Sequence, residues 1–193
     1  RPVVAYDGVA GAAAARAWWC LRWAGHDEVR VLDGGLAAWV RAGGPVEVGE
    51  VAPPEDEAGG SSSSAPGERS TMPVVTAEDL AGRSGALLDA RSAERFRGEV
   101  EPVDPVAGHV PGAISCPTTA VQGADGRYLP PDQLRAVLAP LVGDGPGAAY
   151  CGSGVTASQL VLAAHEVGIE LALYPGSWSH WIRDPRRPVA TGS

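Results

Sequence analysis

A cysteine in a glycine-rich segment is the part of this sequence best suited to chemistry. Residues 150–157 read Tyr-Cys-Gly-Ser-Gly-Val-Thr-Ala, with a short apolar run before them and a helix-forming run at 157–165. The pattern predicts a strand, a loop and a helix in succession. Cys151 would then lie at a helix N-terminus, where unpaired N–H groups and the helix dipole favour an anion. A thiolate held there is a nucleophile, although a cysteine ending a strand is often a small buried apolar residue.

Four further motifs accompany this loop along the chain. They are Leu-Leu-Asp-Ala-Arg at 87–91, Arg-Phe-Arg-Gly at 95–98, Gly-His-Val-Pro-Gly-Ala at 108–113, and Gly-Ser-Trp at 176–178 followed by Trp181. Together the five motifs resemble those of the rhodanese-like sulfurtransferases, whose mercaptopyruvate branch carries a loop of the Cys-Gly-Ser-Gly-Val-Thr type. The resemblance covers residues 74–192, and five motifs in the same order make it specific.

The resemblance implies a sulfurtransferase that works through a persulfide on Cys151. The thiolate would take the outer sulfur of a donor, and a thiol or cyanide would then remove it, giving ping-pong kinetics. Backbone N–H groups of the loop could converge on the charged terminal sulfur. This scheme needs no metal and no organic cofactor. The loop residues expected to bind substrate are Gly152, Ser153, Gly154, Val155 and Thr156.

Arg95 is the best candidate outside the loop for binding the donor. Donors of this class are small anions, and a guanidinium binds a carboxylate or sulfonate through two parallel hydrogen bonds. Arg95 resembles the family's substrate arginine; without that resemblance, a solvated surface arginine is the simpler interpretation. Arg91 is expected to support the loop, and Asp89 to accept backbone hydrogen bonds. The resemblance implicates Ser153 in polarising the donor and leaves Thr156 structural, although helix capping would explain either hydroxyl.

The sequence leaves the donor open between thiosulfate and 3-mercaptopyruvate. Relatives specific for mercaptopyruvate tend to carry another arginine before the Gly-His motif, but residues 99–107 contain none. The basic residues that follow the cysteine in thiosulfate-preferring relatives are replaced here by Gly152 and Ser153. We therefore expect a small anionic sulfur donor as one partner. The expected acceptor is a small thiol or a thioredoxin-like protein.

Other residues able to do chemistry are predicted to be structural. His109 lies in a turn-rich segment, where a structural hydrogen bond is expected in preference to a role as general base. Trp178 and Trp181 are expected to pack in the core or in a pocket wall. Cys20 and Cys116 are expected to be buried apolar residues.

The N-terminal part of the chain repeats part of the C-terminal half. Residues 3–8, 12–23 and 29–36 parallel 148–152, 157–167 and 171–178. The offsets lie between 142 and 144 at the matched residues Asp7/Cys151, Gly25/Gly168 and Trp39/Trp181. Asp7 takes the place of Cys151, so the first copy lacks the nucleophile. We predict half of an inactive domain at 1–46, a linker rich in Pro, Gly and Ser at 47–73, and a catalytic domain at 74–193. A start at Arg1 indicates a fragment or a removed N-terminus.

Helices and strands are predicted to alternate within the second copy. Helices are expected at 77–80 with Thr76 as N-cap, 93–96, 131–141 and 153–167, and strands at 86–89, 113–116, 148–150 and 171–174. This alternation indicates an α/β fold, a three-layer rhodanese-like domain with a parallel sheet flanked by helices, duplicated with the first copy incomplete. Ligands bind outside the carboxyl ends of such strands, and Cys151 falls there.

Composition argues against several other kinds of protein. The formal net charge is −8, and all basic residues are arginines without a basic run, which argues against nucleic acid. No apolar run approaches the ~20 residues of a membrane span, so no membrane partner is expected. Three cysteines at wide, irregular spacings fit neither a zinc site nor a disulfide framework. They favour a reducing compartment, the cytoplasm.

Two alternative functions stay open. A cysteine-dependent phosphatase of similar fold would need an arginine six residues after the cysteine, where Ala157 stands, so this alternative is disfavoured. The other is a catalytically silent interaction module or inactive fragment. The incomplete first copy should leave the apolar side chains of Ala14, Trp18, Leu21 and Trp39 without a covering sheet.

Overall fold

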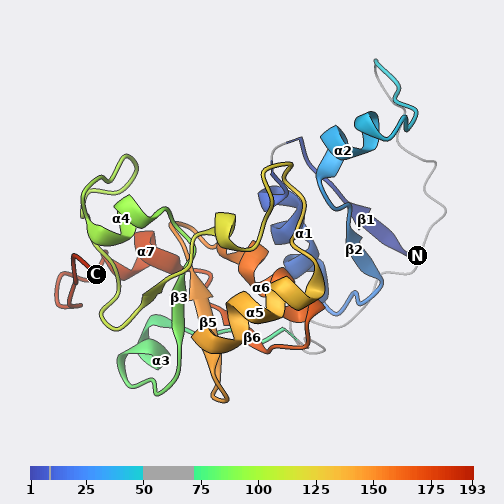
Figure 1. The fold of residues 1–193 in the computed structure, drawn as a ribbon. Coiled ribbons are helices and arrows are strands. Elements are labelled where there is room, and N and C mark those ends of the chain that lie inside the picture. Colours follow the sequence, from blue (N-terminus) through green and yellow to red (C-terminus); the bar gives the residue numbers. More distant parts are fainter. Residues whose placement is uncertain (9, 50–71) are drawn as a thin grey trace.

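The centre of the second copy is a four-stranded parallel sheet (Figure 1). The computed structural model describes residues 1–8, 10–49 and 72–193. The sheet has the strand order β4-β3-β5-β6, and each neighbouring pair is parallel. Its strands are β3 (Leu87–Asp89), β4 (Ile114–Ser115), β5 (Gly147–Tyr150) and β6 (Leu171–Leu173). The predicted α/β architecture with a parallel sheet is confirmed.

Helices cover both faces of this sheet, and two separate apolar cores result. On one face, Leu88 and Ala149 pack with α5 (Pro131–Val142) and α6 (Ala157–Glu166). On the other face, Ala148 and Tyr150 pack with α3 (Ala77–Ala81) and α7 (Ser177–Trp181). Because successive residues of a strand point to opposite faces, both sides of β5 are buried and the strand reads as a continuous apolar run.

The remaining elements of the second copy are short. They are α4 (Ala93–Arg97) and a 3₁₀ turn at Thr118–Ala120. Local sequence sets several boundaries: Thr76 and Asp79 form a capping box before α3, and Pro131 occupies the first turn of α5. Gly168 adopts a left-handed conformation after α6, as predicted for a residue that ends a helix.

The first copy forms a small unit of its own with a two-stranded parallel sheet. Its elements are β1 (Val3–Ala5), α1 (Ala12–Trp23), β2 (Val29–Val31) and α2 (Gly35–Arg41). This order of strand, helix, strand and helix repeats that of β5, α6, β6 and α7 in the second copy. The structure therefore agrees with the internal repeat found in the sequence.

The expectation of an uncovered first copy is wrong in part. Ala14 and Trp18 are buried, because α1 packs along α6 of the second copy, with the ring of Trp18 5.3 Å from that of His165. Leu21 is half-buried. Trp39, on α2, is exposed as expected. The two equivalent helices of the repeat thus lie side by side at the junction (Figure 1).

One sequence prediction, the start of the helix after Cys151, needs correction, and another, the linker, falls mostly on residues that the structure does not describe. The helix predicted at 153–167 begins only at Ala157, because Gly154 adopts a left-handed conformation (φ +79°) that no α-helix continues through. Most of the predicted linker lies outside the described residues. The division into 1–46, 47–73 and 74–193 remains a prediction.

Candidate active site

Cys151 follows directly after β5, at the carboxyl edge of the sheet. Its side chain is buried, and its Sγ accepts a hydrogen bond from the N–H of Gly154 at 3.1 Å. The loop between β5 and α6 therefore curls back over the sulfur, as the glycine-rich sequence predicts. Gly154 can make this turn because it has no β-carbon.

The loop is fixed from behind by the start of α7. The Cys151 carbonyl accepts from the N–H of Trp178, and the Gly152 carbonyl from that of Ser179, both at 3.0 Å. The Cys151 N–H donates to the Oγ of Ser177 at 3.1 Å, and this hydroxyl donates to the Tyr174 carbonyl. The sequence alone did not assign Ser177 this role in holding the loop, although the residue lies in the Gly-Ser-Trp motif.

The remaining amides of the loop have no acceptor in the described part of the chain. Those of Gly152, Ser153, Val155, Thr156 and Ala157 donate to no backbone or side-chain group there. Consecutive N–H groups left unpaired at the start of a helix form a site for an anion. The arrangement would suit a negatively charged sulfur beyond the Sγ of Cys151.

The Gly154→Ala variant is expected to damage this loop severely. A β-carbon on Gly154 would lie 2.6 Å from the carbonyl oxygen of Pro175, and the φ of +79° would add strain. The loop must shift, and since a misplacement of about 1 Å can reduce a rate ~100-fold, sulfur transfer should fall by that order. Steady-state kinetics with a donor and cyanide would measure the effect.

Gly126→Ala provides the matched control. Gly126 has the same backbone conformation (φ +78°) but nothing within 4 Å of an added β-carbon. This variant carries the strain without the clash and should keep its activity. Equal kinetics for both variants would contradict the role given to the Gly154 turn.

Arg95, the predicted donor-binding residue, borders the loop. Its two terminal nitrogens would lie 3.7 Å from a β-carbon placed on Gly152. The guanidinium also donates to Glu101, through Nη2 at 2.6 Å and Nε at 3.2 Å, and Asp104 lies 3.6 Å away. The two parallel hydrogen bonds that the sequence assigned to the donor are therefore made to Glu101.

Arg91 lies beneath the site in a buried ionic network. It donates to Asp89 through Nε and Nη2, to the Gly108 carbonyl at 2.7 Å, and to Glu101 at 3.3 Å. Burial opposes the charge of Arg91, but the hydrogen bonds and charge of Asp89 outweigh it and raise the arginine's pKa. The guanidinium also lies over the ring of Trp178, 4.8 Å from its centroid. Arg91 thus supports the helix that holds the loop.

Ser153, Thr156 and His109 are the other residues that the sequence analysis singled out. Ser153 is exposed at the tip of the loop. Thr156 precedes α6 but makes no capping hydrogen bond through its side chain. The Nδ1 of His109 is 2.7 Å from the Phe96 carbonyl and its ring stacks on Phe96, so the expected structural hydrogen bond is present.

The remaining cysteines and tryptophans are structural, with one correction. Trp178 and Trp181 are buried, as predicted. Cys116 is also buried, and the loss of hydration raises the pKa of its thiol to about 11. Cys20, predicted to be buried, is only half-buried, because one side of α1 faces away from α6.

Asp7 occupies in the first copy the place that Cys151 occupies in the second. Its carboxylate accepts hydrogen bonds from the N–H groups of Gly11 and Ala14 at 3.0 Å each. The loop before α1 is therefore organised around an anion that belongs to the chain itself. This loop also contacts the second copy, because the Ala10 carbonyl accepts from the side chains of Gln122 and Gln159.

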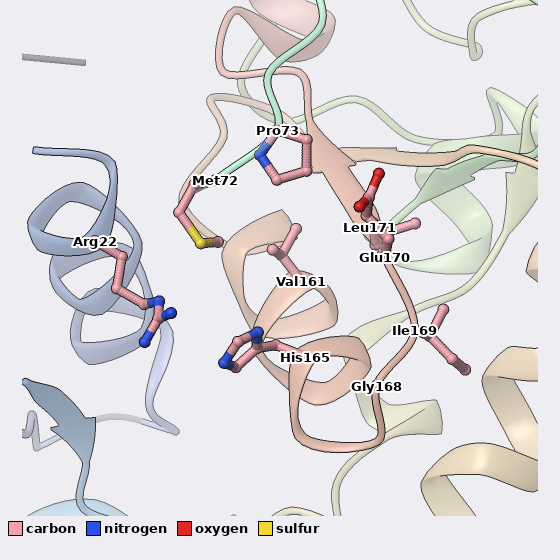
Figure 2. A pocket seen from close by; sticks show the side chains of 9 residues that line it. All are labelled: Arg22, Met72, Pro73, Val161, His165, Gly168, Ile169, Glu170 and Leu171. Carbon is pink, nitrogen blue, oxygen red and sulfur yellow. The ribbon is translucent and has the colours of Figure 1, made fainter. Parts of the chain in front are cut away.

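A pocket of about 250 Å³ lies at the other end of α6 (Figure 2). Arg22 from α1 faces His165 from α6 across it. The apolar part of its wall is formed by Met72, Pro73, Val161, Ile169 and Leu171. Burial and the charge of Arg22 lower the pKa of His165. Since Cys151 lies at the opposite end of α6, this pocket is separate from the candidate active site.

Comparison with known proteins identifies the family. The model of the "Rhodanese-like domain" matches residues 1–42 and 75–184. A Pseudomonas aeruginosa protein named "Probable 3-mercaptopyruvate sulfurtransferase" is 50% identical over 98% of this chain and 68% of its own length. A Mycobacterium tuberculosis protein named "Putative thiosulfate sulfurtransferase SseB" is 47% identical over 100% of this chain and 68% of its own. The crystal structure of YnjE superposes with a TM-score of 0.86 at 28% identity.

The chain belongs to the rhodanese-like family, as the five motifs indicated. Its curated relatives carry the names of sulfurtransferases, which supports enzymatic sulfur transfer as its chemistry. The chain covers about two thirds of those two relatives and 49% of the YnjE chain. In the described part of the chain, no helix is long and apolar enough to span a membrane.

Proposed function

We propose that this chain transfers sulfur from thiosulfate or 3-mercaptopyruvate to a thiol or cyanide through a persulfide on Cys151. The observation that carries the proposal is the loop from Gly152 to Ala157: the N–H of Gly154 donates to the buried sulfur, and the other five N–H groups have no acceptor in the described residues. These groups would stabilise the negative charge that the outer sulfur carries while it is bound. The names of the relatives support the same chemistry.

The reaction would proceed in two steps. The Cys151 thiolate attacks the outer sulfur of the donor, so that an S–S bond forms while the bond from this sulfur to the rest of the donor breaks. Sulfite leaves from thiosulfate, and pyruvate leaves from 3-mercaptopyruvate after a proton is added to carbon. An acceptor thiolate or cyanide then attacks the outer sulfur and regenerates the Cys151 thiolate.

The binding residues would have separate parts in this scheme. The amides of Gly152 to Thr156 would contact the transferred sulfur, Ser153 would meet the donor at the mouth of the loop, and Arg95 would attract its acid group. A small thiol or a thioredoxin-like protein would be the acceptor, in the cytoplasm. Residues 74–193 would act as the catalytic domain, and residues 1–46 as an inactive support.

Intact-protein mass spectrometry tests the proposal directly. The protein is incubated with thiosulfate and, separately, with 3-mercaptopyruvate, and its mass is measured before and after cyanide is added. We expect a gain of one sulfur atom that maps to the Cys151 peptide and that cyanide removes. No gain with either donor would contradict the proposal and favour a silent interaction module. The donor that loads the protein at lower concentration is the preferred one.

A further inference from the structure

Glu101 has more polar contacts than any other carboxylate near the candidate site. Its Oε1 accepts from Arg95 at 2.6 Å and from the N–H groups of Val103 and Asp104 at 3.1 Å. Its Oε2 accepts from Arg95 at 3.2 Å and from Arg91 at 3.3 Å. The side chain is only 4% exposed. A carboxylate so placed holds two arginines and one loop together.

The contact with Glu101 leaves one terminal nitrogen of Arg95 without a partner among the described residues. The Nε and Nη2 atoms point to Glu101, whereas Nη1 donates to no group in the described residues. Nη1 and Nη2 are both 3.7 Å from the β-carbon position of Gly152, the residue after Cys151. Of the two terminal nitrogens beside the loop, Nη2 is bonded to Glu101, and Nη1 is left for a donor.

We propose that Glu101 is a positioning residue for donor binding, which occupies the two-pronged edge of Arg95 and keeps Nη1 free beside the catalytic loop. The inference rests on the proposed sulfur transfer. The proposal differs from the sequence-based expectation in how Arg95 binds the donor. The acid group of the donor accepts one charge-assisted hydrogen bond from Nη1, and the two-pronged contact of Arg95 is made to Glu101. Without Glu101, Arg95 would sample several rotamers, and each donor molecule would have to order it on binding.

The chain contains a matched control pair two residues away. Glu99 binds Arg97 with the same two-pronged geometry, at 2.7 and 2.8 Å. This pair is exposed, with 54% of the Glu99 side chain and 37% of the Arg97 side chain accessible. Glu99→Gln and Glu101→Gln remove the same charge from the same kind of ion pair. Only Glu101→Gln should affect donor binding at the site.

The experiment compares donor kinetics of the two variants with those of the unsubstituted protein. Glu101→Gln should raise the KM for the donor ~10-fold while kcat changes less than about threefold, since the lost interaction acts on binding. Glu99→Gln should change neither constant. An unchanged KM in Glu101→Gln, or equal changes in both variants, would overturn the proposal.

A double substitution shows whether Glu101 acts through Arg95. The Arg95→Ala variant should lose donor affinity, and adding Glu101→Gln should cost nothing further; a second, additive loss would overturn the inference. If Glu101→Gln does not fold, Arg95→Lys carries the test. A lysine ammonium has no planar fork to hold a two-pronged contact to Glu101 while a separate fixed nitrogen meets the donor, so KM should rise; an unchanged KM would overturn the proposal. Persulfide loading of the unsubstituted protein is measured first, so that a failure of sulfur transfer itself is recognised separately.

Discussion

The Cys151→Ser variant is expected to lose sulfur transfer almost completely, by at least ~1,000-fold in kcat/KM. A serine hydroxyl keeps its proton at neutral pH and forms no stable counterpart of a persulfide. The loop should keep its shape, because Ser177 and the start of α7 hold it through the backbone of residues 151 and 152. Cyanide-coupled kinetics with each donor would measure the loss.

Cys20→Ser is the control for this substitution. Cys20 is half-buried on α1, outside the site, and its replacement should leave the kinetics unchanged. Cys116 should not substitute for the missing nucleophile, because burial raises the pKa of its thiol to about 11 and it stays protonated at neutral pH. More than a tenth of the original activity in Cys151→Ser would rule out the persulfide mechanism at this residue.

The Arg91→Met variant is expected to be the least stable single substitution of the site. The side chains of Asp89 and Arg91 are 0% and 1% exposed, and Glu101 also accepts a hydrogen bond from Arg91. Removing the cation leaves a buried carboxylate without its partner. The free energy of unfolding should therefore fall by about 3–5 kcal/mol, as is typical when a buried ion pair loses one member. Urea unfolding followed by tryptophan fluorescence would measure the change.

An exposed ion pair of the same type provides the comparison. Arg186 binds Asp184 through two hydrogen bonds, but the Arg186 side chain is 88% exposed. Water solvates both partners when the pair is broken, so Arg186→Met should not move the unfolding midpoint measurably. Similar midpoints for Arg91→Met and Arg186→Met would show that the buried network does not hold the site together.

The sequence predicted the fold well where the signals were local. β5 is a short apolar run between turn residues, and the starts of α3 and α5 carry their own signals, Thr76 and Pro131. The internal repeat was visible because its two copies share strand, helix and glycine positions. The start of α6 was predicted too early, at Ser153: residues 152–156 are Gly, Ser, Gly, Val and Thr, which are weak helix formers, and the left-handed turn at Gly154 keeps them out of the helix.

Contacts between distant segments could not be predicted in the same way. The pairing of Arg95 with Glu101 depends on how residues 99–107 fold back, and their sequence carries no periodic signal. The burial of Trp18 depends on α1 meeting α6, from another copy of the repeat. The sequence could name the residues around Cys151, but it could not show which edge of Arg95 faces them.

The carboxylate of Asp7 has a consequence for the catalytic cycle. During turnover, the group at the start of α6 would alternate between a thiolate and a longer persulfide, so the negative charge there would move. Asp7, in the loop before the neighbouring helix, is part of the chain, and the proposed reaction would not change its carboxylate. The negative charge beside α1 would therefore stay the same throughout the cycle. The hydrogen bonds of Gln122 and Gln159 to the Ala10 carbonyl would also hold α6 in the same position against the first copy at every stage.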